Sequence, residues 1–165
     1  MELYFLRHAD AAGQLTQDPA VDSKRPLTTQ GVEDTRRAAQ GMKRMSLSFD
    51  RIVSSPYRRA LETAEIVAQG LGYKGKIEPS DALRPGADFK AFSKLLSRFE
   101  GDESVLFVGH QPVLGEFISG LVFGEIHAAV DLKKGGLCHI ETSELGGNLA
   151  ELEWLLTSEQ LQRYA

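Results

Sequence analysis

MELYFLRHADAAG, residues 1–13, places an arginine and a histidine directly after a short apolar run. Residues 1–6 are typical of a buried strand, so Arg7 and His8 fall at the point where that strand ends. Ligands of open α/β sheets bind at the carboxyl ends of the strands. Arg7 and His8 are therefore either part of a site or merely the edge of an element, and the rest of the sequence has to decide between the two.

Strand-like and helix-like stretches alternate along the chain. Further strands are expected over residues 49–55, 74–79, 104–109, 136–142 and 149–156, with a turn at 146–148. Helices are expected over residues 87–99, 112–123 and 158–164, from Thr28 or Thr29 to residue 45, and from Pro56, as the first helical residue, to a stop at Gly70 and Gly72. The alternation predicts an α/β three-layer sandwich with a mostly parallel central sheet.

Size and composition are those of an ordinary soluble domain. The chain has 165 residues, of which 42% are hydrophobic and 25% charged, and we expect a single domain over residues 1–165. Its formal net charge of −4 disfavours nucleic acid as a partner. The single cysteine, Cys138, excludes an internal disulfide and suits a reducing compartment.

The longest apolar stretch, residues 105–124, is almost long enough to span a bilayer. Polar residues interrupt it, so a buried strand followed by a buried helix is the better interpretation. The apolar run at the N-terminus has no basic leader and is a poor signal peptide. We therefore expect a cytoplasmic monomer without a membrane partner.

Three predicted strand ends carry unusual polar residues. The first strand ends in Arg7 and His8, the second leads through two serines to Arg58 and Arg59, and the third ends in His110. If the strands are parallel, these ends lie at one edge of the sheet. Arginine forms bidentate, charge-assisted hydrogen bonds to phosphoryl oxygens, so the expected ligand at this edge of the sheet is a phosphoryl group.

Competing motifs fail on context or spacing. GLGYKG, residues 70–75, fits a dinucleotide-binding pattern but follows a helix and opens none. A cysteine-phosphatase loop would need an arginine six residues after Cys138, where Glu144 stands. The chain has neither a G-x-x-x-x-G-K-[ST] loop nor a G-x-S-x-G elbow. No metal-ligand spacing is formed by Glu125, His127 and His139, so no metal and no cofactor are expected.

Four blocks together resemble the signatures of the histidine phosphatase superfamily, which has the phosphoglycerate mutase-like fold. They are LRHADA (6–11), RPLTTQG (25–31), SSPYRRALETAE (54–65) and VGHQPVLGEF (108–117), in the order of that family and across most of the chain. Ala9 stands where the family usually has glycine. The compact chain, without a large insertion between the second and third blocks, is similar to the SixA-type phosphohistidine phosphatases.

The resemblance implies a role for each matching residue. His8 matches the nucleophile that becomes phosphorylated, and Arg7 matches the phosphate-binding arginine beside it. Arg59 matches the second phosphate-binding arginine, which leaves Arg58 as a neighbour. His110 matches the second histidine of the site, with a catalytic and phosphate-binding role. Arginines that neutralise a phosphoryl group make a metal ion unnecessary, and water then hydrolyses the phosphohistidine.

The sequence departs from larger members of the family in the acid that protonates an alkoxide leaving group. One group has this acid directly after the second histidine, where Gln111 stands here, and another has it in the segment that reads SDALRPGADF, residues 80–89. Asp10, Asp81 and Asp88 are possible substitutes, although none fits the family pattern. An imidazole can leave without such an acid, because histidine titrates near about 6.5.

The expected function is removal of a phosphoryl group from a phosphohistidine-containing protein of a signalling or phosphotransfer system. Two alternatives remain open. One is a small-molecule phosphomonoesterase of the same superfamily that uses Asp10, Asp81 or Asp88 as its acid. The other is a phosphoprotein-binding module without turnover, which would have no need of the nucleophile His8.

Overall fold

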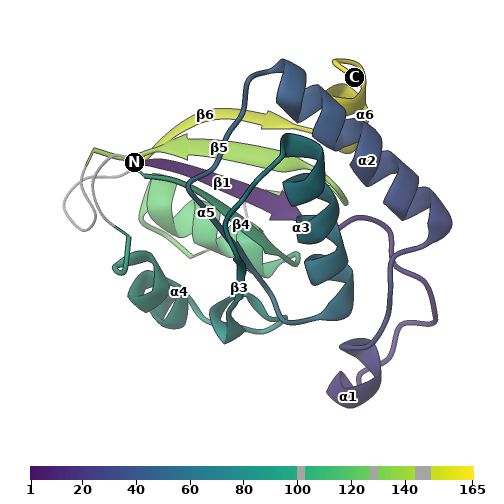
Figure 1. Ribbon diagram of the computed structural model, residues 1–165. Coiled ribbons are helices and arrows are strands. Elements are labelled where there is room, and N and C mark those ends of the chain that lie inside the picture. Colours follow the sequence, from purple (N-terminus) through teal and green to yellow (C-terminus); the bar gives the residue numbers. More distant parts are fainter. Residues whose placement is uncertain (100–102, 127–129, 144–149) are drawn as a thin grey trace.

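A central sheet in the strand order β3-β2-β4-β1-β5-β6 organises the protein (Figure 1). The structure is a computed structural model that describes residues 1–99, 103–126, 130–143 and 150–165. Neighbouring strands pair in parallel from β3 to β1, and β5 runs antiparallel to both β1 and β6. The mostly parallel sheet is thus confirmed. The strands are β1 Glu2–Arg7, β2 Arg51–Ser54, β3 Ile77–Pro79, β4 Ser104–Gly109, β5 Leu137–Glu141 and β6 Glu151–Leu156.

Helices pack on both faces of the sheet and complete the three layers (Figure 1). The core on one face includes α2 (Thr29–Arg44), α3 (Arg58–Leu71) and α6 (Ser158–Gln162). The core on the other face includes α4 (Phe89–Leu96) and α5 (Val113–Phe123). The short α1 (Pro19–Asp22) and the 3-10 turn η1 (Asp81–Leu83) lie in the connections. No helix in the described part of the chain is long and apolar enough to cross a bilayer.

Most helix boundaries follow the sequence signals, with two corrections in α3. Thr28 caps α2, and its hydroxyl accepts from the Gly31 amide at 2.9 Å. The expectation that Pro56 is the first helical residue was wrong, because α3 begins at Arg58. The Ser55 hydroxyl accepts from the Tyr57 amide at 3.3 Å and so holds the preceding residues in a turn. The predicted turn at 146–148 lies outside the described residues.

Gly70 does not end α3 as the sequence suggested. It lies inside the helix, and only Gly72, with φ of 72°, stands at the left-handed position after the last turn. A Cβ at residue 70 would lie 2.7 Å from the Cβ of Ala39 in α2. Gly70 is therefore a close-packing residue between two helices, which a local pattern does not distinguish from a helix stop.

The register of the sheet sets the place of the candidate site. Arg7 at the end of β1 lies opposite Gly109 at the end of β4, and Ser54 at the end of β2 lies opposite Val108. The three strands are parallel, so the residues that follow them emerge at the same edge. The predicted meeting of the three strand ends is confirmed.

Candidate active site

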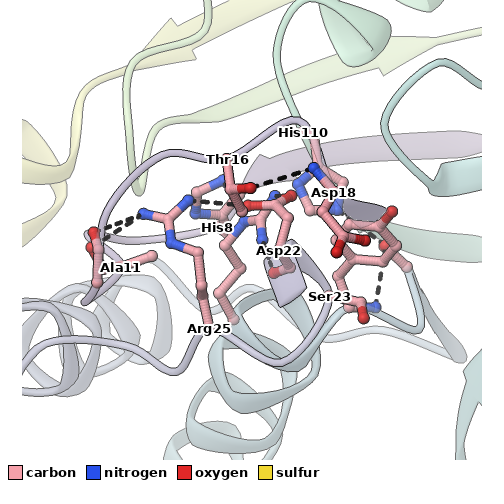
Figure 2. A network of polar contacts seen from close by, with 12 residues as sticks. His8, Ala11, Thr16, Asp18, Asp22, Ser23, Arg25 and His110 are labelled. Carbon is pink, nitrogen blue, oxygen red and sulfur yellow. Dashed lines mark hydrogen bonds and ion pairs between the residues drawn. The ribbon is translucent and has the colours of Figure 1, made fainter. Parts of the chain in front are cut away.

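The predicted site residues converge beyond the ends of β1, β2 and β4. The ring centroids of His8 and His110 lie 5.0 Å apart. Arg59, in the first turn of α3, approaches the same place, and its Nε lies 3.2 Å from Nε2 of His8. Arg7 lines the pocket that these residues share. Figure 2 shows the two histidines within one network of polar contacts.

His8 is held as a neutral imidazole with one unprotonated ring nitrogen. Its Nδ1 lies 2.6 Å from the carbonyl oxygen of Ala9, and because a carbonyl can only accept, Nδ1 carries the proton. Nε2 therefore has the lone pair, toward which Arg59 Nε donates. Burial lowers the pKa of His8 to about 4; the bond to Ala9 opposes that shift and the charge of Arg59 adds to it. His8 Nε2 is a base and nucleophile at neutral pH.

His110 has one buried ring nitrogen without a hydrogen-bond partner among the described residues. Its Nε2 lies 2.8 Å from the Ser55 hydroxyl, which accepts from the Tyr57 amide and has both a proton to donate and a second lone pair with which to accept. Burial, with the nearby charge of Arg59 as a further cause, lowers the pKa of His110 to about 2, so the ring is neutral. When the Ser55 hydroxyl donates to Nε2, the proton of His110 is on Nδ1, a buried atom with no hydrogen-bond partner among the described residues. An oxygen of a bound anion could accept from it.

Arg59 is buried, with 5% of its surface exposed, and its guanidinium is fixed on three sides. Besides the bond to His8, Nη1 donates to the carbonyl oxygen of Asp22 at 2.8 Å and Nη2 to the Asp22 carboxylate at 2.9 Å. The guanidinium also lies 5.1 Å from the ring centroid of Tyr57. Its neighbour Arg58 is exposed and pairs with Glu62 at 2.7 Å.

Arg7 supplies a second cation, with spare donors. Its Nη1 donates to the carbonyl of Leu132 at 3.0 Å, whereas its buried Nε has no hydrogen-bond partner among the described residues. Burial lowers the pKa of Arg7, and the charge of Asp131 opposes that shift. A partly buried guanidinium with an unused N–H can bind an anion in the pocket.

The site opens into a pocket of about 490 Å³. Its lining also includes residues that sequence reasoning did not single out, chiefly Asp22, Arg25 and Lys134. Arg25 holds the loop over residues 11–13 beside the pocket, because it donates to the carbonyls of residues 11, 12 and 13 and to the Asp22 carboxylate (Figure 2). Asp22 is the last residue of α1 and Arg25 follows three residues later, and this short spacing is the local sequence signal for their ion pair.

The three carboxylic acids considered as proton donors do not line this pocket. Asp81 pairs with Arg84 at the surface, and Asp88 caps α4 by accepting from the Ala91 amide at 2.7 Å. Asp10 accepts from Lys134 at 2.6 Å, which lowers its pKa and keeps it charged at the rim. Gln111 does line the pocket, and its amide donates to the carbonyl of Val130.

Asp22 is the one carboxylic acid among the described residues that line the pocket. Burial raises its pKa, but the hydrogen bonds from Arg25 and Arg59 outweigh that effect, so the pKa is lowered. Asp22 is therefore ionised and is a poor proton donor. Within the described ranges, no three His, Cys, Asp or Glu side chains are grouped so that they could hold a metal ion.

Comparisons with known proteins found a matching family model and several similar proteins. The family model of the histidine phosphatase superfamily (branch 1) matches residues 3–85. An uncharacterized protein of Picosynechococcus sp. is 41% identical over 83% of this chain and 82% of its own. Phosphohistidine phosphatase SixA of Escherichia coli is 35% identical over 76% of each chain. A structure of the protein histidine phosphatase SixA complexed with tungstate covers 98% of this chain and 99% of its own, with 29% identity and a TM-score of 0.84.

Proposed function

The chain belongs to the histidine phosphatase superfamily, and on that premise we propose that it is a phosphohistidine phosphatase acting on a histidine of a signalling or phosphotransfer protein. The observation that carries the proposal is a pocket that joins a neutral His8 Nε2 to two arginines, while its one carboxylic acid is ionised. Such a pocket can accept a phosphoryl group but cannot readily protonate an alkoxide. The two SixA proteins that it resembles support the same substrate class.

In the proposed reaction, His8 Nε2 attacks phosphorus while the bond from phosphorus to the substrate nitrogen breaks. The bonding electron pair stays on the departing imidazole, whose other nitrogen carries the proton, so the ring leaves neutral. Arg7, Arg59 and Nδ1–H of His110 bind the phosphoryl oxygens and stabilise the charge of the transition state. Water then attacks the phosphorus on His8, the bond from phosphorus to Nε2 breaks with its electron pair returning to Nε2, and the proton of the water leaves with the released phosphate or to solvent.

The leaving group favours phosphohistidine over alkyl phosphates. An alkoxide is about as basic as hydroxide, whose parent water has a pKa of about 15.7, and it needs a proton as it departs. A protonated imidazole ring needs none, since histidine titrates near about 6.5. Transfer from one imidazole to another is also nearly balanced in energy. The small-molecule phosphomonoesterase and the non-catalytic binding module remain the alternatives that the experiment has to separate.

The test compares phosphate release from a histidine-phosphorylated phosphotransfer protein with release from phosphoserine proteins and small alkyl phosphates, all with a chelator present. We expect release from phosphohistidine at least about a hundred times faster, the lower limit of what a missing general acid costs. Equal rates on alkyl phosphates would favour the phosphomonoesterase. Binding without release from any of them would favour the binding module.

The adjacent arginines of α3 offer a matched pair of variants. We expect Arg59→Ala to lower kcat/KM by about 10²–10³, because it removes a buried cation that lies next to His8 Nε2. Arg58→Ala should stay within about twofold, because that side chain is exposed and pairs with Glu62. Similar losses in both variants would contradict the assignment of Arg59 as the phosphate-binding arginine.

The protonation of His8 can be followed directly. Because the pKa of His8 is lowered to about 4, we expect its imidazole resonances to titrate near pH 4 instead of near 6.5. The nucleophile therefore stays neutral throughout the physiological range and is lost only below about pH 5. Nuclear magnetic resonance of the histidine side chains, with His8→Ala used to assign the signal, measures this value. A midpoint near 6.5 would show that His8 is not desolvated as described.

A further inference from the structure

Asp22 lies where an anionic ligand would meet Arg59. Its carboxylate and its backbone carbonyl accept from Nη2 and Nη1 of Arg59, the two nitrogens of the fork with which arginine binds phosphoryl oxygens. The third nitrogen of the same guanidinium, Nε, donates to His8 Nε2. The negatively charged carboxylate of Asp22 therefore lies in the pocket, separated from His8 Nε2 by the guanidinium of Arg59 (Figure 2).

The other cations of the pocket are already engaged in part. Arg25 pairs with the Asp22 carboxylate at 2.9 Å, which offsets part of its charge, and donates to the carbonyls of the loop over residues 11–13. Lys134 pairs with Asp10 at the rim, at 2.6 Å. Arg7 forms no ion pair with a carboxylate among the described residues that line the pocket. No such partner therefore competes with a phosphoryl group for its guanidinium. Arg59, in contrast, is shared between Asp22 and any anion that enters.

We propose that Asp22 sets the charge selectivity of the pocket, so that phosphorylated ligands whose non-transferred part is neutral or cationic are preferred to those with a second acidic group. A second anion beside the phosphoryl group would stand near the Asp22 carboxylate and compete with it for Arg59, and such like-charge contacts are costly. Arg25 holds the other oxygen of Asp22, so the carboxylate stays in the pocket when Arg59 turns to a phosphoryl oxygen.

Phosphohistidine fits this requirement. Its ring carries no second anion, and the N–H of the ring can donate to a carboxylate that has two of its four acceptor positions free. Small phosphorylated carboxylic acids, in contrast, carry a second anion that would stand near the Asp22 carboxylate. The inference deepens and rests on the proposed function, because it concerns the phosphate site of that function.

Three phosphates with the same two-carbon skeleton test the idea by calorimetric titration. 2-Aminoethyl phosphate carries a cation on the non-transferred part, 2-hydroxyethyl phosphate carries no charge there, and phosphoglycolate carries an anion. The wild-type protein should bind them in that order, from the tightest to the weakest. In Asp22→Asn the ratio of the Kd values of the first and the last should change by about tenfold in favour of phosphoglycolate.

Asp18→Asn is the matched control. Asp18 lies four residues earlier in the same segment, is exposed, and only caps α1 through the Ala20 amide, a role that asparagine also fills. This variant should keep the wild-type ratio. If Asp22 only held Arg59 in place, Asp22→Asn would weaken all three ligands alike, and an unchanged ratio would overturn the proposal.

The failure of this inference can be told apart from a failure of the proposed function. Inorganic phosphate binding that is lost in Arg59→Ala would support the phosphate site itself. If phosphate binds in this way but wild-type protein binds phosphoglycolate as tightly as 2-aminoethyl phosphate, the role of Asp22 is refuted alone. If inorganic phosphate does not bind at all, the proposed function is refuted, and the charge selectivity with it.

Discussion

We expect His8→Ala to reduce phosphate release from phosphohistidine to the uncatalysed background. Among the described residues that line the pocket, His8 has an unprotonated ring nitrogen, Nε2, that lies beside the guanidinium of Arg59. Burial raises the pKa of Cys138 to about 12, and this cysteine lies in β5 outside the pocket lining, so it cannot replace the histidine.

The chemical intermediate is the direct readout. Mixing the enzyme with a labelled phosphohistidine protein and stopping the reaction in alkali should trap a phosphorylated enzyme in the wild type and none in His8→Ala. Phosphorus bound to a histidine nitrogen withstands alkali and is lost in acid, which distinguishes it from a phosphoester. Substantial turnover in the variant would mean that water attacks the substrate directly, and the covalent mechanism would be wrong.

The fold should survive this substitution. Its chief structural consequence is a buried Nε of Arg59 without its acceptor, at a cost of about 1–3 kcal/mol. Arg59 keeps both bonds to Asp22, and the bond between His8 and Ala9 is local. An unchanged circular dichroism spectrum and retained binding of inorganic phosphate are the controls that separate lost chemistry from lost structure.

The sequence predicted the sheet and the convergence of the site because both follow from local patterns. Buried strands end at Arg7 and at Gly109, and parallel pairing brings such ends together without any knowledge of the tertiary contacts. The motif around Arg59 was placed correctly for the same reason, since it follows β2 directly. Local sequence patterns therefore identified the site residues that follow strand ends.

Asp22 was missed because its position depends on contacts between distant segments. It lies in a polar connection 37 residues before Arg59, and no periodicity marks it. The same cause explains Pro56, where a bond between Ser55 and His110, 55 residues apart, accompanies the turn that delays α3. The candidate proton donors show the opposite error, in which the sequence suggested a catalytic role that the contacts do not support. The carboxylate of Asp88, for example, caps a helix.

The largest effect on substrate choice concerns the leaving group. Gln111, which lines the pocket, is a neutral amide, and Asp22, the one carboxylic acid among the described lining residues, is kept ionised by two arginines. The leaving group must therefore depart with its negative charge, without a proton from the enzyme, unless it already carries a proton itself. We expect kcat/KM to fall steeply as the leaving group becomes more basic, with alkyl phosphates about 10²–10⁴ below aryl phosphates and phosphohistidine.

A series of substituted phenyl and alkyl phosphates at one pH measures this slope. Repeating it with Asp10→Asn, Asp81→Asn and Asp88→Asn tests each carboxylate as a hidden donor. We expect all three variants to keep the wild-type slope, because Asp81 and Asp88 are engaged elsewhere on the surface and Asp10 is held charged by Lys134. A flat wild-type series would show that a proton donor exists, and the variant that steepens it would identify the donor. In that case the phosphomonoesterase function would replace the one proposed here.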